Sequence, residues 1–386
     1  MTIQSKKLSS FCRTGSGGTP SRSNSKFFEN GTIPWVKSGE LKNRYITHVE
    51  EYITELAVEK SSAKLVSKGS LLIAMYGATV GEVSQLTFDA TTNQAICNIS
   101  PDENICDVNY LYRFLEASKP YLLSRRVGGG QPNISQGIIK DLEVPLPPLL
   151  EQRRIASILD KADELRQKRQ QGIEKLDQLL QATFIDMFGD PVSNPKKWKL
   201  GLLGDLGELD RGVSKHRPRG APELLGGIHP LIQTGDVARS QGYIRSYTST
   251  YSDSGLAQSK KWMKGTLCIT IAANIANTGI LTFDACFPDS VVGFLPNQTS
   301  NTEYVQGLFL FFKQILEEKA PQSAQKNINL AILRALEVPI PPKDLQEKWS
   351  KVALSIEEQK QKLYKQLDIQ NQLFSSLQNQ TFSGNL

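Results

Sequence analysis

Two long segments of the chain space apolar and polar residues as one face of an α-helix would. Residues 149–187 hold a single glycine, Gly172, and no proline, and residues 345–380 repeat the pattern. Steps of three and four residues between apolar positions are typical of a helix that presents a coiled-coil-like stripe. The apolar positions are Ile155, Ile158, Leu159, Ala162, Leu165, Ile173, Leu176, Leu179, Leu180 and Phe184, then Val352, Ile356, Leu363, Leu367, Leu373, Phe374 and Leu377.

The residues before each long segment follow a different pattern. Residues 1–148 are rich in glycine, serine, threonine and asparagine, and short β-branched or aromatic runs such as 71–76 and 94–99 predict strands between turns. One helix is predicted over 108–125, where apolar residues recur at helical spacing. Pro147 and Pro148 suit the start of the long helix, because a proline there lacks only an N–H that would stay unpaired. Each long helix therefore follows a mixed, strand-rich domain.

The chain contains this arrangement twice. Asn133-Ile134 recurs as Asn327-Ile328, and Pro145 recurs as Pro339, which is 194 residues later. A Thr-Phe pair also recurs near the end of each long segment, at 183–184 and 381–382. A period this long is no solenoid repeat of about 20–50 residues, so it indicates a duplicated domain-plus-helix unit. The paired asparagines are either turn residues that precede a short helix or strand, or DNA contacts.

An apolar stripe needs a partner, and the other long helix offers a matching one. We therefore predict an α+β fold with two mixed, strand-rich domains separated by a long antiparallel two-helix coiled-coil spacer with pseudo-twofold symmetry. The alternative is that each helix folds back on its own domain. The predicted boundaries are 1–148 and 190–342 for the domains, with 149–189 and 343–386 for the spacer helices.

Composition narrows the class of protein. At 386 residues the chain exceeds one ordinary core, and 39% hydrophobic with 22% charged residues describes a folded, soluble protein. No apolar stretch is long enough to span a membrane, and the first residues lack the apolar core of a signal peptide. We therefore expect a cytoplasmic protein without a membrane partner. The five scattered cysteines form no Cys-x-x-Cys pair, which favours reduced, buried thiols over a metal site.

Binding residues are easier to find than catalytic ones. The sequence has no phosphate-binding loop, no His-Glu-x-x-His and no Gly-x-Ser-x-Gly, so we predict neither catalysis nor a cofactor in this chain. The net charge of +6 is mildly basic, and basic and amide residues gather in both strand-rich domains. Such side chains neutralise phosphates or pair with base edges. The candidate DNA-binding residues are Arg22, Lys37, Ser38, Lys42, Arg44, Tyr76, Arg125, Arg126, Gln131, Lys215, Arg217, Arg219, Gln233, Thr234, Arg239 and Lys326.

The start of the first long helix carries a family resemblance. Residues 145–156, read as Pro-Leu-Pro-Pro-Leu-Leu-Glu-Gln-Arg-Arg-Ile-Ala, resemble the specificity subunit of type I DNA restriction–modification enzymes, as do 131–134 and 184–189. In the second copy, residues 343–347 (Lys-Asp-Leu-Gln-Glu) depart from this pattern. The resemblance implies two target-recognition domains, each reading one half of a bipartite site in double-stranded DNA. It also implies a non-catalytic subunit.

The resemblance further implies partners. Methyltransferase subunits would dock on this chain, use S-adenosylmethionine to methylate adenine, and bring a restriction and translocase subunit with them. Two other classes stay open from the residues. One is a non-catalytic coiled-coil scaffold whose end domains bind protein or carbohydrate, and the other is a self-contained modification enzyme, which the missing motifs disfavour.

Overall fold

The computed structural model describes residues 4–125, 133–216, 218–319 and 327–382. The chain divides into two compact units. Unit 1 comprises Met1–Gln170 with Lys365–Leu386, and unit 2 comprises Gln171–Tyr364. Within the described ranges, no helix is long and apolar enough to cross a membrane. Arg126, Gln131, Arg217 and Lys326 lie outside the described residues.

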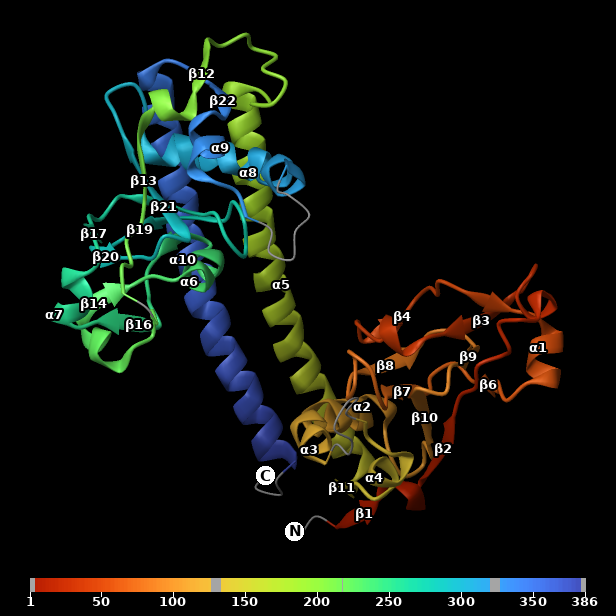
Figure 1. Cartoon of the computed structure of the whole chain (residues 1–386). Helices are drawn as coiled ribbons and strands as arrows, with labels where there is room; N and C mark the ends of the chain where they lie inside the picture. Colours follow the sequence, from red (N-terminus) through yellow and green to blue (C-terminus); the bar gives the residue numbers. More distant parts are fainter. Residues whose placement is uncertain (1–3, 126–132, 217, 320–326, 383–386) are drawn as a thin grey trace. The chain divides into compact units, whose positions relative to one another are not determined.

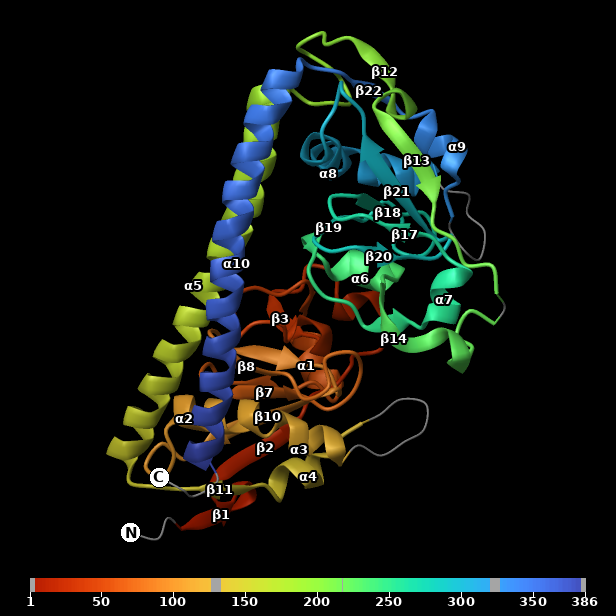
Figure 2. The same cartoon turned by 90° about the vertical axis from the view of Figure 1, so that its left-hand side faces the viewer.

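The strand-rich domain of unit 1 contains two sheets and a separate strand pair. A five-stranded sheet has the order β2-β10-β7-β8-β4, a four-stranded sheet has the order β5-β3-β9-β6, and β1 pairs with β11 (Figures 1 and 2). Within the larger sheet only β4 and β8 run parallel. The strands are β1 Ser5–Lys7, β2 Cys12–Ser16, β3 Ile33–Val36, β4 Tyr45–Ile46, β5 Tyr52–Ile53, β6 Leu65–Val66, β7 Leu71–Ala74, β8 Val83–Leu86, β9 Ala90–Thr92, β10 Ile96–Pro101 and β11 Glu143–Pro145.

The strand-rich domain of unit 2 repeats this topology strand for strand. Its sheets have the orders β13-β21-β18-β19-β15 and β16-β14-β20-β17, and β12 pairs with β22. The parallel pair of the larger sheet is again the last one, β15 with β19. The strands are β12 Leu200–Leu202, β13 Gly207–Arg211, β14 Leu225–Leu231, β15 Gly242–Ile244, β16 Ser249–Tyr251, β17 Lys261–Trp262, β18 Leu267–Thr270, β19 Thr278–Leu281, β20 Ala285–Cys286, β21 Val291–Pro296 and β22 Glu337–Pro339.

The helix that follows β10 in unit 1 and β21 in unit 2 differs between the copies. The helix predicted over 108–125 is two helices, α2 and α3, because Pro120 cannot donate the backbone hydrogen bond that a continuous helix needs. The equivalent helix α8 is continuous. The α-helices are α1 Glu55–Lys60, α2 Val108–Ala117, α3 Lys119–Ser124, α4 Gln136–Lys140, α5 Leu149–Phe188, α6 Thr234–Arg239, α7 Asp253–Ala257, α8 Thr302–Lys319, α9 Leu330–Arg334 and α10 Lys343–Phe382, and the 3-10 helices are Leu8–Ser10, Ser25–Phe27, Ser38–Glu40, Leu203–Asp205 and Pro222–Leu224.

The two 40-residue helices contribute to both units and pair with each other within each unit. In unit 1, Arg166 Nε on α5 donates to Asn371 Oδ1 on α10 at 2.7 Å. In unit 2, Lys360 Nζ on α10 lies 2.7 Å from Asp177 Oδ1 on α5. Gln378 near the end of α10 donates to Glu116 of the first domain at 3.2 Å, and the Phe184 ring near the end of α5 lies 5.8 Å from the Tyr304 ring of the second domain. Each domain therefore contacts the end of the other domain's helix as well as the start of its own. The predicted α+β fold with two strand-rich domains and two long helices is confirmed.

The buried stripe is narrower than the periodicity predicts. Four apolar positions satisfy the helical spacing but are 42–58% exposed, namely Ile158, Leu165, Leu179 and Leu373. A seam between two helices buries little more than two positions in seven, so flanking apolar positions face solvent. The other predicted stripe residues are buried or half-buried, namely Ile155, Leu159, Ala162, Ile173, Leu176, Leu180, Val352, Ile356, Leu363, Leu367 and Phe374.

The far ends of the long helices match at a different place from the Thr-Phe pairs. The Phe188 ring lies 4.9 Å from the Tyr304 ring, and the Phe382 ring lies 5.5 Å from the Tyr110 ring. Phe188 and Phe382 are 194 residues apart, as Pro145 and Pro339 are. The structural equivalent of Phe382 is therefore Phe188 and not Phe184, which lies one helical turn earlier.

A buried glutamine anchors the start of each long helix. Gln152 Nε2 donates to the carbonyl oxygens of Ile105 (3.0 Å) and Pro147 (2.8 Å), and its Oε1 accepts from Asp107 N (2.9 Å). Gln346 makes the equivalent three bonds to Thr299, Pro341 and Asn301. The second copy keeps this glutamine although the residues around it differ. Its amide has no unsatisfied N–H, so it fixes the angle between the domain and the helix.

Candidate nucleic-acid interface

Two candidate residues of each domain stand at the same point of the duplicated frame. Lys37 and Ser38 follow β3, and Gln233 and Thr234 follow β14. In both copies a short helix begins at the second residue of the pair. A carboxylate three residues on accepts the backbone N–H of the first residue of each pair. Glu40 Oε2 accepts from Lys37 N at 2.6 Å, and Asp236 Oδ2 accepts from Gln233 N at 2.9 Å. Such capping contacts hold both backbones in place.

In unit 1 the cations near this point are paired with carboxylates. Lys37 Nζ lies 2.7 Å from Glu50 and 3.0 Å from Glu51, and Arg22 Nη1 lies 2.7 Å from Glu51. The hydrogen bond from Lys37 lowers the pKa of Glu50, the hydrogen bond from Arg22 lowers that of Glu51, and the bond to Glu50 raises the pKa of Lys37. The Lys37–Glu50 and Arg22–Glu51 pairs each include one exposed side chain, and surface ion pairs of this kind are worth about 0–1 kcal/mol. A phosphate oxygen can therefore replace either carboxylate at little cost.

Unit 2 carries different chemistry at the equivalent point. Gln233 is neutral and exposed, and it lines a cavity of about 230 Å³ together with Arg219. Arg219 is paired with Asp289, and Arg239 Nη2 lies 2.8 Å from Asp236 Oδ1. Thr234 is half-buried. The structure thus brings Gln233 and Arg219 together, and it places an amide where unit 1 has an ammonium group.

A second pair of equivalent points lies where the β7–β8 and β18–β19 loops begin. Tyr76 forms an isolated antiparallel bridge with Asn133, and Ala272 forms one with Asn327. Both asparagines are exposed, whereas the isoleucine after each is buried. Burial raises the pKa of half-buried Tyr76. The bridges show that these asparagines pair with residues that follow β7 and β18, and whether they also contact DNA stays a prediction.

The remaining described candidates do not gather at one point. Arg44 is largely buried, and its guanidinium donates to Asp160 on α5 at 2.6 Å and to Asn109 on α2 at 2.9 Å. These contacts indicate a structural role for Arg44. Lys42 and Lys215 are exposed, and the exposed Arg125 stacks its guanidinium on the Tyr121 ring at 5.3 Å.

Sequence reasoning missed a strained loop in unit 2. Between β18 and β19, Ala273, Asn274 and Ala276 have positive φ angles of 45°, 34° and 57°. In unit 1 the equivalent loop has glycines, Gly77 and Gly81, at its positive-φ positions. Left-handed backbone costs a non-glycine residue about 1 kcal/mol or more, and such residues cluster at functional sites. No signal in the unit 2 sequence marks this loop except its alignment with the glycines of unit 1.

Metal and thiol chemistry find no support at these points. Within the described ranges, no group of three or more histidine, cysteine or acidic side chains could hold a metal ion. All five cysteines are buried and free. Burial raises the pKa of Cys12 and of Cys97 to about 12, so both stay protonated near neutral pH.

Comparison with known proteins identifies the duplicated unit. The type I restriction modification DNA specificity domain matches residues 2–175 and again residues 195–370. The chain belongs to this family. Its two matches cover both copies of the strand-rich domain and most of both long helices, so the type I specificity domain is the unit that the chain contains twice.

Curated relatives cover part of the type I specificity chain. The EcoR124I/EcoR124II specificity subunit of Escherichia coli is 31% identical over 187 residues, which is 47% of this chain and 46% of that one. The MjaIX specificity subunit of Methanocaldococcus jannaschii is 29% identical over 227 residues, or 54% and 52% of the two chains. The chain therefore spans about half the length of these curated relatives.

Solved structures share the fold of the type I specificity family over the whole chain. The S subunit of a type I restriction–modification system from M. genitalium matches with a TM-score of 0.60 and 15% identity, covering 99% of this chain and 96% of that one. A second structure, described in terms of complex assembly and conformational transition of the type I system, matches with a TM-score of 0.58 and 16% identity, covering 100% and 98%. At this identity the likeness concerns the fold alone.

Proposed function

We propose that this chain is the specificity subunit of a type I restriction–modification complex in the cytoplasm. Each strand-rich domain reads one half of a bipartite, asymmetric site in double-stranded DNA. The chain itself is non-catalytic. It positions methyltransferase subunits, which bind S-adenosylmethionine and methylate adenine, and through them a restriction and translocase subunit. Family membership and the E. coli and M. jannaschii relatives support this proposal.

One observation supports the proposal that the two domains read different half-sites. The two domains share their strand order, yet the residues at the equivalent point after β3 and β14 are Lys37-Ser38 in one and Gln233-Thr234 in the other. A lysine ammonium donates to the O6 and N7 of guanine, whereas a glutamine amide pairs bidentately with adenine. One frame with two different sets of donors is suited to an asymmetric site.

The cations around these points supply affinity rather than sequence preference. Lys42 and Lys215 are exposed, and Arg22, Arg219 and Arg239 are exposed cations that are paired with carboxylates, of which the Arg239 partner, Asp236, is buried. Phosphate contacts of this kind release counterions and make binding fall steeply with salt. Arg44 is left out of this set because its guanidinium is engaged by α5 and α2.

Sequence selection by the full-length chain with its methyltransferase subunit tests the proposal. Gln233→Ala should reduce the preference for the correct base at one or two base pairs of one half-site, and Lys37→Ala should do the same in the other half-site. The expected loss of discrimination against the wrong base is about 5- to 150-fold in each case. Lys161→Ala, which removes an exposed lysine from α5, is the control and should leave both half-sites unchanged. If no motif is enriched by the unaltered chain, a scaffold that binds protein or carbohydrate becomes the better reading.

We propose further that the two long helices set the gap between the half-sites. The division between the units falls between residues 170 and 171 in α5 and between 364 and 365 in α10. Inserting seven residues at both places keeps the apolar stripe in phase and lengthens each helix by about 10 Å. The preferred gap should grow by about three base pairs. An unchanged gap, measured by selection on sites with variable spacers, would rule the helices out as the ruler.

A further inference from the structure

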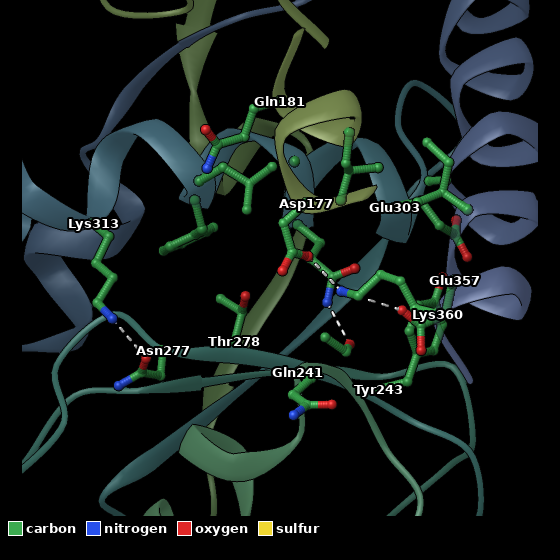
Figure 3. A pocket seen from close by; sticks show the side chains of 18 of the residues that line it. Asp177, Gln181, Gln241, Tyr243, Asn277, Thr278, Glu303, Lys313, Glu357 and Lys360 are labelled. Carbon is green, nitrogen blue, oxygen red and sulfur yellow. Dashed lines mark hydrogen bonds and ion pairs between the residues drawn. The ribbon is translucent and has the colours of Figure 1, made fainter. Parts of the chain in front are cut away.

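Two cavities occupy equivalent places in the two units. The cavity in unit 1 has a volume of about 630 Å³ and is lined by Arg44, Tyr45 and Arg113. The cavity in unit 2 has a volume of about 390 Å³ and is lined by Gly242, Tyr243 and Gly307 (Figure 3). The unit 1 cavity lies between the strand-rich domain and α5, and the unit 2 cavity lies between the strand-rich domain and both long helices.

The strand register establishes which residues correspond at the edge of the larger sheet. Ile46 on β4 is opposite Leu86, and Ile244 on β15 is opposite Leu281. The threonine after each of these leucines donates its hydroxyl to the isoleucine carbonyl oxygen, from Thr87 at 2.6 Å and from Thr282 at 2.7 Å. Arg44 therefore corresponds to Gly242, two residues before each isoleucine.

A buried tyrosine establishes the correspondence on the helix that lines each cavity. Tyr110 Oη donates to the Pro145 carbonyl oxygen at 2.7 Å, and Tyr304 Oη donates to that of Pro339 at 2.8 Å. Arg113 and Gly307 both lie three residues after that tyrosine. Both arginines of the unit 1 cavity are thus glycines in unit 2.

In unit 1 the two guanidinium groups are bound by acceptors of the same unit. Arg113 donates to Asp160 at 2.8 Å, to Glu116 at 2.9 Å and to Asp163 at 3.2 Å. Arg44 donates to Asp160 and Asn109, and its guanidinium lies 5.0 Å from the centre of the Tyr45 ring. Unit 1 thus shows which chemical group this place accommodates.

Unit 2 keeps acceptors but lacks both guanidinium groups. Glu303 corresponds to Asn109 and Glu357 to Asp163, while Leu354 takes the place of Asp160. Glu357 has cations of its own, since Arg245 lies 3.0 Å and Lys360 lies 3.8 Å from its oxygens. Figure 3 shows Lys360 between Glu357 and Asp177, with Lys313 across the cavity beside Asn277.

Glu303 is the acceptor left without a cation. Its Oε2 accepts a hydrogen bond from Ser350 Oγ at 3.2 Å, and among the described residues no cationic group lies within ion-pair distance of it. The Tyr243 hydroxyl, on the same cavity, is buried and has no hydrogen-bond partner in the described part of the chain. The half-buried Glu303 carboxylate lacks a cation, and the buried Tyr243 hydroxyl lacks a hydrogen-bond partner. Together they favour a ligand that brings hydrogen-bond donors and a positive charge.

We propose that the unit 2 cavity binds a guanidinium group. The planar guanidinium offers five donors and matches a carboxylate bidentately, so Glu303 would bind one edge while the Tyr243 hydroxyl accepts another N–H. The volume of about 390 Å³ suits a small ligand or an inserted side chain. The group comes either from a free guanidino compound or from an arginine side chain of a bound polypeptide. This inference does not depend on DNA reading.

Calorimetry on the full-length chain with two isosteric probes tests the proposal. Ethylguanidinium should bind at least tenfold more tightly than neutral ethylurea at matched ionic strength. Glu303→Gln keeps the shape of the side chain and should weaken ethylguanidinium binding at least tenfold. The control Glu318→Gln removes the same charge from an exposed position of α8 that is outside the cavity lining, and it should change binding less than twofold.

Several outcomes would overturn the proposal. Equal binding of the two probes, no binding of either, or an unchanged affinity in Glu303→Gln would each rule out a guanidinium site at Glu303. A second arm compares acetyl-Gly-Arg-Gly-amide with its citrulline counterpart. Arginine peptide binding at least tenfold tighter than ethylguanidinium assigns the site to a polypeptide side chain, and weaker peptide binding assigns it to a free guanidino compound.

Discussion

The place where each strand-rich domain meets the long helices is built from opposite chemistry in the two units. In unit 1, Arg113 is 1% exposed and is surrounded by carboxylates from α2 and α5, with the Phe374 ring at 5.7 Å. In unit 2 the equivalent residue is Gly307, and aromatic rings fill the space instead. The Phe184 ring lies 5.1 Å from that of Trp349.

The hydrogen bonds that flank these two positions are nevertheless the same in both units. The tyrosine bond to a proline carbonyl and the triply bonded glutamine recur at both junctions. Because these bonds fix each domain on its helix, the side chains packed beside them can differ between the units, provided that buried charges and hydrogen-bonding groups find partners within the same unit. The comparison teaches that the ends of α5 and α10 are not interchangeable, since the Phe184 ring requires a glycine opposite it.

The largest effect is expected from forcing the unit 1 residue into unit 2. A Cβ at position 307 would lie 2.6 Å from the Phe184 ring and 3.2 Å from that of Trp349. Gly307→Arg should therefore lower the free energy of unfolding by about 4 kcal/mol, because the new side chain overpacks a place that two aromatic rings already fill. Urea unfolding followed by circular dichroism measures this.

The matched control for this change is Gly220→Arg in the same unit. A Cβ at position 220 would meet nothing within 4 Å, so its effect should stay under about 0.5 kcal/mol. Thiol labelling locates the damage, because Cys268 and Cys286 belong to unit 2 and the other three cysteines to unit 1. Unit 1 thiols labelling first in Gly307→Arg would contradict the packing argument.

A smaller but still large effect is expected from removing the buried arginine of unit 1. Arg113→Met should lower the free energy of unfolding at pH 7 by about 3 kcal/mol, because Glu116, Asp160 and Asp163 lose their shared partner. Arg154→Met, which breaks an exposed pair with Glu151, should cost less than about 0.5 kcal/mol.

This deficit should depend on pH in a definite direction. Burial, the largest cause, already raises the pKa of Glu116 above its ordinary value of 4.5, and losing Arg113 raises it further. A folded-state pKa above the unfolded one favours the folded state at low pH and disfavours it as pH rises. The deficit of Arg113→Met should therefore shrink between pH 7 and pH 4. A deficit that grows on acidification would exclude carboxylate repulsion as its cause.

The smallest loss of stability is expected from removing a hydrogen bond that both units share, the one from a buried tyrosine to a proline carbonyl oxygen. Tyr110→Phe and Tyr304→Phe each remove a buried O–H that donates to a proline carbonyl, and each should cost about 1.5 kcal/mol. Equal costs are expected, since the geometry is the same in both units. Tyr121→Phe, at an exposed ring, should be neutral. Urea unfolding measures all three, and costs that differ twofold would show that the two junctions are not equivalent.

Much of the architecture could be predicted from local patterns. Residues 149–187 and 345–380 repeat at helical spacing, and the 194-residue offset of Pro145 and Pro339 revealed the duplication. The family resemblance at residues 145–156 is confirmed by the match of the DNA specificity domain. Which of the proposed residues contact DNA stays a prediction, because base contacts depend on side chains in loops whose spacing follows no period.

Other features could not be predicted because they depend on residues far apart in the sequence. Nothing near Gly307 indicates that the Phe184 ring, more than 100 residues earlier, occupies the space of its missing side chain. Arg44 looked like surface, yet Asp160 and Asn109 bind its guanidinium. The corresponding positions of Arg44 and Gly242 became visible only through the pairing of β4 with β8 and of β15 with β19.

The sequence by itself determined the elements and their duplication, because helix periodicity, turn residues and repeated motifs act over short stretches of chain. Only the tertiary structure decided what each copy encloses. Burial and pairing depend on which distant side chains meet. At equivalent positions, Arg113 is therefore a guanidinium paired with carboxylates in unit 1, and Gly307 packs against aromatic rings in the lining of the unit 2 cavity.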